Sequence, residues 1–395
     1  MASARLPSAV VTVLISLIAL LLYNRGGPLS RLYLNAPSRL PRENNLSQPS
    51  IKFSNTVRNC EDVILDVEEG FALLSCDPSR DVWNTVMGTF IDPTSSPSTG
   101  IYIWHYSTPD TEPEQVKLLD FSRRSQEFHP LGIEYHAPSN TLFIINHSPS
   151  GPTVELFRFY PSERAATHIT TLRHPRLATP NSLAVLSSTE FLVTNDHYFH
   201  RRFNPFFALL ETYLAFRGGS VIHVKLHPNI ADGIKAASNL MQLPFANGIA
   251  HLNASTIAVA SSSMNTVYLY SITQPASEDS PPYLEQLSSI SLPFHPDNLS
   301  VDGSGKLLIA GHPHGPTLEK VAKSNRFCHS GVAEEREKCF TEGLSWVAEW
   351  SEVEGVKTLY VGDEYGTSTT AVRDVGRGVG VVTGLYAEGV YVWRD

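Results

Sequence analysis

Charged residues are scarce in this sequence, and they form no long runs of one sign. Asp, Glu, Lys and Arg together make up only 17% of the 395 residues, and the formal net charge is −9. A chain without basic clusters offers no electrostatic surface for nucleic acid. We therefore exclude nucleic acid as a partner, although a mildly acidic protein can still bind a cation at a local site.

Helical periodicity is also nearly absent, and Phe206–Phe216 (FFALLETYLAF) is the main helix candidate. Short β-type runs recur instead, each bounded by turn residues, as in Leu142–Asn146, Phe191–Asn195 and Leu307–Ala310. Fully apolar runs and alternating runs such as TVELFRF form pairs that recur roughly every fifty to seventy residues. This repetition predicts an all-β fold, a β-propeller of about six blades, rather than a sandwich.

Cysteine is limited to four residues, Cys60, Cys76, Cys328 and Cys339, none of them at zinc-finger spacing. An even count suits disulfides in an exported protein. Three connectivities are possible, and the local pairs Cys60–Cys76 and Cys328–Cys339 are the simplest. The second pair would close a charged surface insertion at about 328–339 (CHSGVAEEREKC).

The N-terminus holds the longest apolar run, Ala9–Tyr23, which follows Arg5. It is slightly short for a hydrocarbon core of roughly 30 Å, so it indicates a signal peptide or an uncleaved signal anchor. No small-residue cleavage site follows, which favours the anchor and a membrane location. We expect residues 1–23 to form this segment, residues 24–50 a Pro- and Asn-rich stalk, and residues 51–395 the propeller in the secretory pathway.

Four sequons match the glycosylation pattern. Those at Asn45 and Asn253 are plausible acceptors, whereas we expect Asn146 and Asn298 to be buried.

Four polar clusters share one shape, an apolar residue, cysteine or proline followed by Asn, Asp or Glu at the start of a strand. They are Cys60-Glu61-Asp62, Pro180-Asn181-Ser182, Ala246-Asn247-Gly248 and Pro296-Asp297-Asn298. The first strand of each propeller blade lines the central channel, so residues at these starts point toward a common axis. Carboxylate and amide oxygens suit calcium, whereas zinc or copper would require His or Cys. Each Asn alone could simply cap a turn, but recurrence at blade spacing favours one calcium site.

Several motifs resemble the paraoxonase (arylesterase) family: FANGI at Phe245–Ile249, DNLSVD at Asp297–Asp302, TNDHYF at Thr194–Phe199, GHPHG at Gly311–Gly315, and Asn146-His147 followed by TVELFRF. The similarity covers most of the chain from Glu61 to His314. It implies a six-bladed propeller with two calcium ions in its tunnel. The catalytic calcium would be bound by Glu61, Asn181, Asn247, Asp297 and Asn298. A second, structural calcium would be bound by Asp62 and the backbone carbonyl of Ile133.

Three departures from the family pattern stand out. Ser182 replaces an aspartate beside the structural calcium, which should weaken that site. His147 matches one member of the family's histidine dyad, but Leu131 stands at the other. His129 lies two residues earlier and could partly substitute, or it could be a structural histidine. No cysteine follows Cys339, so the ring must close by strand pairing.

The resemblance implies a calcium-dependent hydrolase of lipophilic lactones and aryl esters. Calcium polarises the carbonyl, and His147 with His129, or Asp297, would activate water. His197 and His312 would shape the mouth of the pocket. No G-x-S-x-G motif suggests a serine nucleophile.

Two alternatives stay open. The chain could be a gluconolactonase-like or strictosidine-synthase-like enzyme of the same architecture, or a catalytically weak or inactive calcium-stabilised binding propeller. The apolar segment Phe203–Phe216 could face a membrane and the substrate, or form a core helix.

Overall fold

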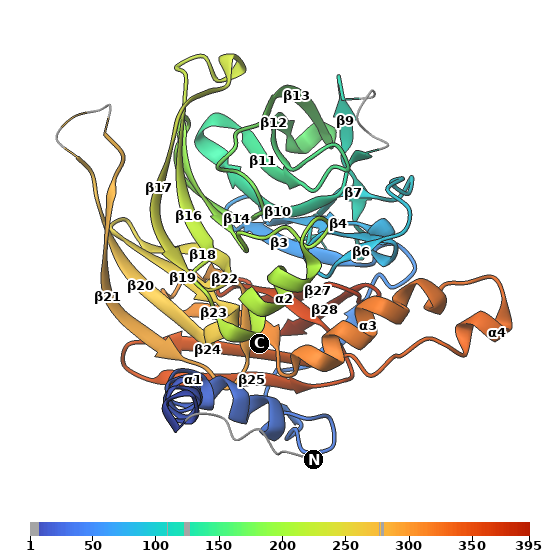
Figure 1. Cartoon of the computed structure of the whole chain (residues 1–395). Coiled ribbons are helices and arrows are strands. Elements are labelled where there is room, and N and C mark those ends of the chain that lie inside the picture. The colour runs from blue at the N-terminus through green and yellow to red at the C-terminus, as the bar shows by residue number, and fades with distance from the viewer. Residues whose placement is uncertain (1–7, 109, 122–126, 276, 278–279) are drawn as a thin grey trace.

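Six sheets radiate around a central axis (Figure 1), as the sequence predicts. This computed structural model describes residues 8–108, 110–121, 127–275, 277 and 280–395. From the axis outward, the first blade consists of β3 (Cys60–Asp66), β4 (Phe71–Cys76), β7 (Gly100–Trp104) and β8 (Glu114–Gln115). The second consists of β10 (Pro130–His136), β11 (Thr141–Asn146), β12 (Thr153–Tyr160), β13 (Ala165–Leu172) and β9 (Lys117–Leu119). The third consists of β14 (Pro180–Ser187), β15 (Glu190–Asn195), β16 (Gly219–Leu226) and β17 (Ile234–Leu243).

The other three blades follow the same order. The fourth consists of β18 (Ala246–Asn253), β19 (Thr256–Ser261), β20 (Thr266–Thr273) and β21 (Tyr283–Ser291). The fifth consists of β22 (His295–Val301), β23 (Leu307–His312), β24 (Ser345–Ser351), β25 (Gly355–Gly362) and β1 (Glu43–Asn44). The sixth consists of β26 (Ser368–Asp374), β27 (Val379–Gly384), β28 (Val390–Arg394) and β2 (Ser50–Lys52). A small hairpin of β5 (Trp83–Asn84) and β6 (Thr89–Phe90) follows the first blade's second strand.

Packing between neighbouring blades explains the two kinds of strand in the sequence. Second strands such as β4, β11 and β23 are buried along their whole length, because both faces contact adjacent blades. Outer strands such as β21 are mostly exposed. One apolar cluster joins residues of β19 and β20 to residues of β23 and β24, and the rings of Phe294 and Trp346 stack within it at 5.4 Å. The core therefore lies between the blades.

Every innermost strand carries a β-bulge near its start. The pairing register shifts between Cys60 and Asp62, Pro130 and Ile133, Pro180 and Leu183, Ala246 and Ile249, Pro296 and Leu299, and Ser368 and Thr370. A bulge inserts unpaired residues and bends the strand, which re-aims side chains. Six bulges at equivalent positions therefore form one ring around the axis.

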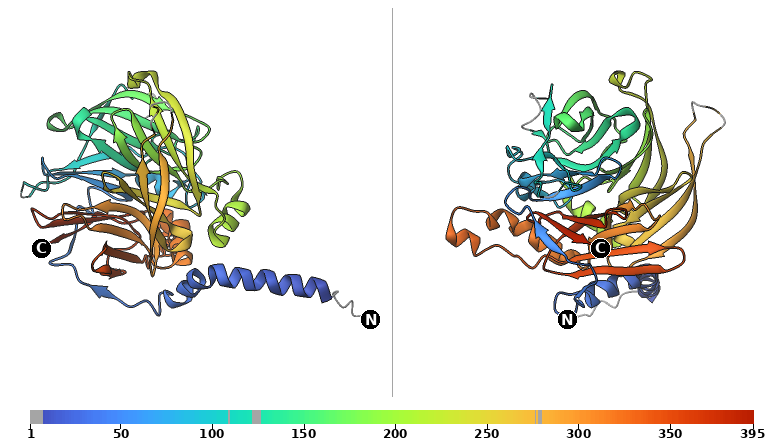
Figure 2. Two further views of the ribbon diagram at one scale, coloured as in Figure 1. Left: turned by 90° about the vertical axis from the view of Figure 1, so that its left-hand side faces the viewer. Right: turned by 180° about the vertical axis from the view of Figure 1, so that it is seen from behind.

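Three helices lie on one side of the propeller (Figure 2): α1 (Ser8–Leu34), α2 (Pro205–Leu214) and α3 (Gly315–Cys328). The helix predicted at Phe206–Phe216 is α2, and its apolar residues are not core residues, since Phe206 and Phe207 are 65% and 51% exposed. Its buried Glu211 accepts hydrogen bonds from the backbone N–H groups of Tyr198 and Phe199. The short helix α4 (Ala333–Arg336) lies within the charged insertion.

The N-terminal segment begins with one long helix, and the residues predicted to form a stalk are ordered against the propeller. Helix α1 runs through residue 23 without a break, and no helix in the described part of the chain is long and apolar enough to cross a membrane. Residues 24–50 pack on the propeller: Arg25, Asn35 and Leu40 are buried, and β1 joins the fifth blade. Local periodicity could not reveal this, because the segment's partners lie hundreds of residues away.

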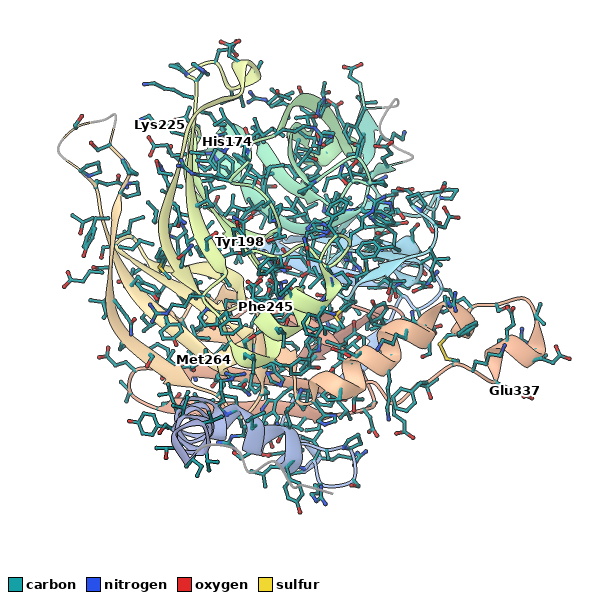
Figure 3. The ribbon with its side chains drawn as sticks, in the orientation of Figure 1. His174, Tyr198, Lys225, Phe245, Met264 and Glu337 are labelled. Carbon is teal, nitrogen blue, oxygen red and sulfur yellow. A yellow bond between two sulfur atoms is a disulfide. The ribbon has the colours of Figure 1, made fainter. Side chains whose placement is uncertain are left out.

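Arg25 joins α1 to the rest of the molecule. Its guanidinium donates to the carbonyl of Tyr213, at 3.0 and 3.2 Å, and to the carbonyl of Ser263 at 2.7 Å. Its Nη1 also lies 3.4 Å from the sulfur of Met264, which is labelled in Figure 3. The C-terminal half of α1 is thus held against α2 and the 3-10 turn η6 (Ser262–Met264).

Strand pairing closes the ring, as expected for a chain without a C-terminal cysteine. β2 pairs with β28 and β1 with β25, so segments near both ends of the chain share two blades. The disulfides are the two local ones, Cys60–Cys76 across β3 and β4, and Cys328–Cys339 around the insertion. Figure 3 shows the second as a yellow bond beside α3. Asn45 and Asn253 are exposed, whereas Asn146 and Asn298 are buried.

This closure predicts different results for two truncations. A chain that begins at Ser54 lacks β1 and β2 and leaves the edges of β25 and β28 unpaired. We expect its melting temperature to fall by more than about 5 °C and aggregation to increase. A chain that begins at Ala36 loses α1 but keeps both strands and should melt within a few degrees of the full chain. Equal melting of all three chains by circular dichroism would contradict the role of these strands.

Candidate metal centre

The predicted calcium ligands converge on the ring of bulges. Glu61 lies on β3, Asn181 on β14, Asn247 on β18, and Asp297 and Asn298 on β22. All five are at most 7% exposed. Each stands at or beside its strand's bulge, where the side chain can leave the blade and face the axis.

Four oxygens of this ring have no hydrogen-bond partner within the described residues. They are Oε2 of Glu61 and the Oδ1 atoms of Asn181, Asn247 and Asn298. A buried acceptor without a donor costs roughly 1–3 kcal/mol, so unpaired groups of this kind are rare. Four of them, from four blades, fit a bound cation that accepts their lone pairs.

Neighbouring hydrogen bonds orient the amides of the ring. The amide nitrogen of Asn298 donates to Oε1 of Glu61 at 2.9 Å and to the hydroxyl of Thr370 at 3.0 Å. The amide nitrogen of Asn247 donates to the hydroxyl of Ser262 at 3.0 Å. In both residues the nitrogen is engaged by the protein and the carbonyl oxygen is left free. That arrangement suits a metal ligand rather than a turn cap.

The carboxylates of this ring lie close enough to disfavour one another's ionised forms. Burial, and then the nearby Asp62 and Asp297, raise the pKa of Glu61 well above its usual range. A divalent cation would stabilise the ionised forms of these side chains. No cluster of three or more His, Cys, Asp and Glu side chains suited to a metal occurs in the described part of the chain. Because the ring has two acids and three amides, its all-oxygen chemistry fits calcium better than zinc.

A cavity of about 110 Å³ opens above the ring. Glu61, Asn181, Asn247 and Asp297 line its floor, and residues of α1, α2 and α3 cover it. Its walls are mainly apolar, formed by Leu29, Leu32, Val86, Met87, Leu131, Phe245, Leu318 and Leu385. A pocket with apolar walls and a few convergent polar groups is typical of a small-molecule site.

The two histidines predicted as catalytic lie away from this cavity. Nε2 of His147 is 2.7 Å from the carbonyl of Pro180, Nδ1 is 2.5 Å from the hydroxyl of Thr85, and burial lowers the pKa of His147 to about 4. His147 lines a second cavity, beside Trp83 and His200. Through Pro180, it contacts the strand that carries Asn181.

His129 is 2% exposed, and both of its ring nitrogens are engaged. Nδ1 lies 2.9 Å from Asp77, and Nε2 lies 2.9 Å from the carbonyl of Pro93. These contacts leave no free nitrogen for proton transfer and are those of a structural histidine. These contacts favour the structural interpretation of His129 over a role in place of the histidine that is missing at Leu131.

The predicted ligands of the second calcium lie below the ring, toward the opposite opening. Asp62 accepts hydrogen bonds from the N–H groups of Ile133 and Val63, at 2.9 and 2.8 Å, and from the hydroxyl of Thr370 at 3.0 Å. Protein donors thus engage both carboxylate oxygens. Ser182, where the family pattern has an aspartate, is 3.4 Å from the N–H of Ile249. These contacts do not require a second ion.

Two further histidines line the main cavity, and one of them was not identified from the sequence. Nε2 of His312 is 2.8 Å from Oδ2 of Asp297. His295, the first residue of β22, lies two residues before Asp297, and its Nδ1 is 3.0 Å from the carbonyl of Ser262. The signal that could have identified it is spacing, because residues i and i+2 of a strand share a face.

His197 lies behind α2 rather than among the residues of the main cavity. Its Nε2 is 2.7 Å from the hydroxyl of Thr212, and its ring centroid is 4.4 Å from that of Phe245, which is labelled in Figure 3. It therefore shapes the pocket indirectly, through the helix and the aromatic wall.

Comparisons with known proteins show which sequences and structures this chain resembles. A family model described as Arylesterase matches residues 93–330. Serum paraoxonase/arylesterase 2 of Canis lupus familiaris is 32% identical over 202 residues, which are 48% of this chain and 51% of that protein. Serum paraoxonase/lactonase 3 of Oryctolagus cuniculus is 31% identical over 234 residues, 53% of this chain and 60% of that protein. The chain spans about half the length of the first of these relatives.

Solved structures show the same architecture at lower identity. A luciferin-regenerating enzyme superposes with a TM-score of 0.50 and 13% identity, covering 88% of this chain and 95% of that one. At this identity the likeness establishes the fold alone.

The ring predicts a calcium-dependent rise in stability. Calcium should raise the melting temperature of the protein and excess chelator should lower it, because an ion bound only by the native state adds about 2.7 kcal/mol at a hundred times its Kd. The variant Asn247→Ala removes one free oxygen and should reduce this shift by more than half in differential scanning fluorimetry.

Asn195→Ala is the matched control. Asn195 is equally buried, but its side chain is hydrogen-bonded to Thr179, Arg176 and Ser220. Its loss should lower stability without changing the calcium shift. A full calcium shift in Asn247→Ala would show that the ligands are assigned wrongly.

Proposed function

Because the chain belongs to the arylesterase family, that of the paraoxonases, we propose that it is a calcium-dependent hydrolase of lipophilic lactones and aryl esters. The observation that carries this proposal is the set of four buried, unpartnered oxygens beneath an apolar cavity. The two named relatives are a paraoxonase/arylesterase and a paraoxonase/lactonase.

The residues divide between binding the ion and binding the substrate. Glu61 and Asp297 supply the negative charge of the calcium site, and Asn181, Asn247 and Asn298 supply neutral oxygens. Bound calcium would act as a Lewis acid toward a carbonyl oxygen. His312 holds the carboxylate of Asp297, which could also orient water. The apolar walls would accept the acyl chain or the aryl ring and exclude solvent.

His147 fits a positioning role better than a direct one, because its hydrogen bond to Pro180 fixes the start of the strand that carries Asn181. A second calcium at Asp62 and Ile133 stays a sequence-based prediction, and the hydrogen bonds around Asp62 favour a site held by the protein itself.

One observation weighs against a sugar-lactone hydrolase. Most of the cavity wall is formed by leucines, Val86, Met87 and Phe245, so only a minority of its groups, among them Arg201 and Tyr213, can hydrogen-bond a polyhydroxylated ring. A calcium-stabilised binding propeller without turnover is the remaining alternative, and it predicts calcium binding in the absence of hydrolysis.

The two disulfides fit the secretory pathway, and exposed apolar residues favour a lipid surface as a further partner. Val13, Ile15 and Tyr23 of α1 are 57%, 61% and 88% exposed, and Phe206 of α2 is 65% exposed. Both helices lie on the same side of the propeller, beside the cavity (Figure 2). We propose that this side contacts membranes and that lipophilic substrates enter from it.

Hydrolysis of phenyl acetate and of a long-chain aliphatic lactone tests the enzymatic proposal. We expect turnover in calcium that excess chelator abolishes and added calcium restores. Asp297→Ala should lower kcat/KM at least about 100-fold, since it removes a charged ligand. Asp232→Ala, on the outer 3-10 turn at Ile230–Asp232, is the control and should have no effect. Calcium binding without chelator-sensitive turnover would favour the binding propeller.

Co-sedimentation with phosphatidylcholine vesicles tests the lipid surface. Replacing Phe206 and Phe207 by Ser should weaken binding tenfold or more, because burying each aromatic side chain contributes about 1.5–3 kcal/mol. Replacing Tyr283 and Leu287 by Ser is the matched control. These two side chains are 67% and 57% exposed, respectively, and they lie on the outer strand β21. Equal loss in the two double variants would argue against a role for α2.

A further inference from the structure

The second cavity, of about 310 Å³, has an excess of positive charge in its lining. Two arginines, Arg201 and Arg202, line it, and Arg201 also lines the main cavity, so the two cavities are adjacent. Among the described residues of the lining, Asp196 alone carries a carboxylate, and Nδ1 of His197 lies 3.1 Å from it. The cavity therefore holds two guanidinium groups and one acid that already has a partner.

The two arginines use only part of their hydrogen-bonding capacity. Nη1 of Arg201 donates to the carbonyl of Met87 at 3.3 Å, and its Nε is buried without an acceptor. Nη1 of Arg202 donates to the carbonyl of Pro149 at 3.0 Å. In the part of the chain that the structure describes, neither guanidinium forms an ion pair with a carboxylate. Because a guanidinium has five N–H donors, both retain donors for an anion.

One further acid contacts the lining of this cavity without belonging to it. Glu127 accepts hydrogen bonds from the hydroxyls of Ser148 and Ser150, at 3.1 and 3.0 Å. No ion pair joins it to either arginine within the described residues. Glu127 therefore leaves both guanidinium groups available to an external anion.

Aromatic rings form much of the wall. Trp83, Phe199, His200 and Phe203 all line the cavity. The guanidinium of Arg202 lies over the ring of Trp83, 5.0 Å from its centroid, and 5.7 Å from that of Phe203. The indole N–H of Trp83 donates to the carbonyl of His147 at 2.9 Å, which fixes the ring. A guanidinium stacked on an aromatic face keeps its edge for in-plane hydrogen bonds to a carboxylate.

We propose that the second cavity binds the anion of an aromatic carboxylic acid. Arg201 and Arg202 pair with its carboxylate, and the rings of Phe199 and Phe203 contact its aromatic ring. The proposal does not depend on the hydrolase function. Ester and lactone hydrolysis releases a carboxylate, however, so an aromatic acid formed in the main cavity would meet this site beside Arg201.

Isothermal titration calorimetry with 2-naphthoate and 2-naphthamide tests the charge requirement. The two probes share one ring system, and the amide lacks the negative charge. At saturating calcium, we expect the carboxylate to bind at least about tenfold more tightly than the amide, because charge-assisted hydrogen bonds are roughly twice as strong as neutral ones.

The variant Arg202→Gln locates the site, because Arg202 lines the second cavity and not the main one. It should weaken binding of 2-naphthoate fivefold or more and change binding of 2-naphthamide less than twofold. Arg202→Lys keeps the charge and should keep most of the affinity. Arg39→Gln is the matched control, since Arg39 is also exposed, lies over the ring of Tyr33 at 3.9 Å, and is outside the cavity. It should bind both probes as the wild type does.

Three results would overturn the proposal. The first is equal affinity for the acid and the amide, and the second is unchanged binding of 2-naphthoate by Arg202→Gln, as expected if the acid bound calcium in the main cavity. The third is competition by inorganic phosphate at concentrations equal to those of 2-naphthoate, which would indicate unselective anion binding. None of these results bears on the hydrolase function, which chelator-sensitive turnover tests separately.

Discussion

Uncompensated oxygens on the propeller axis are the constraint on which the rest of this structure depends. Each comes from a different blade, and each is turned inward by a bulge, so no single blade contains the site. The ring must close before Glu61 of the first blade can meet Asn298 of the fifth, to which it is joined by a hydrogen bond of 2.9 Å. Binding of a metal ion at this ring would therefore be coupled to folding. The energy that the blades gain by packing side by side compensates the burial of groups that repel one another without a cation.

The region just below the ring shows how Ser182, which stands where the family pattern has an aspartate, affects the position predicted for a second calcium. The hydroxyl of Thr370, on the sixth blade, lies 3.0 Å from two acceptors, the backbone carbonyl of Glu61 and the carboxylate of Asp62, and accepts a hydrogen bond from the amide nitrogen of Asn298 at 3.0 Å. Its hydroxyl thus stands between the predicted catalytic ion and the position of the second one. With Ser182 in place of an aspartate, the charge that would hold a second cation is reduced. Neutral protein donors engage both oxygens of Asp62, while burial still raises the pKa of this carboxyl to about 6.

The sequence was informative where chemistry and position coincide within a few residues. The blade number could be predicted from the recurring pairs of strand-like runs, and the two disulfides from the simplest local pairing. The convergence of the five ring residues, Glu61, Asn181, Asn247, Asp297 and Asn298, could be predicted because each lies in a short motif at a strand start. The histidines could not be placed in this way. Whether His147 or His295 faces the cavity depends on bulge geometry and on carbonyls contributed by Pro180 and Ser262, which are distant in sequence. The segment 24–50 looked unstructured for the same reason, since its order comes from contacts with β25 and β28.

The pairing of β1 and β2 with β25 and β28 has a consequence for the timing of assembly. Synthesis proceeds from the N-terminus, so these two short strands are made well before β25 and β28, the strands with which they pair. Four blades can form while the fifth and sixth still wait for strands from both ends of the chain. Contacts of such high sequence separation fold slowly and leave strand edges exposed in the interval. The newly made chain should therefore be prone to aggregation until β28 has been made and paired with β2.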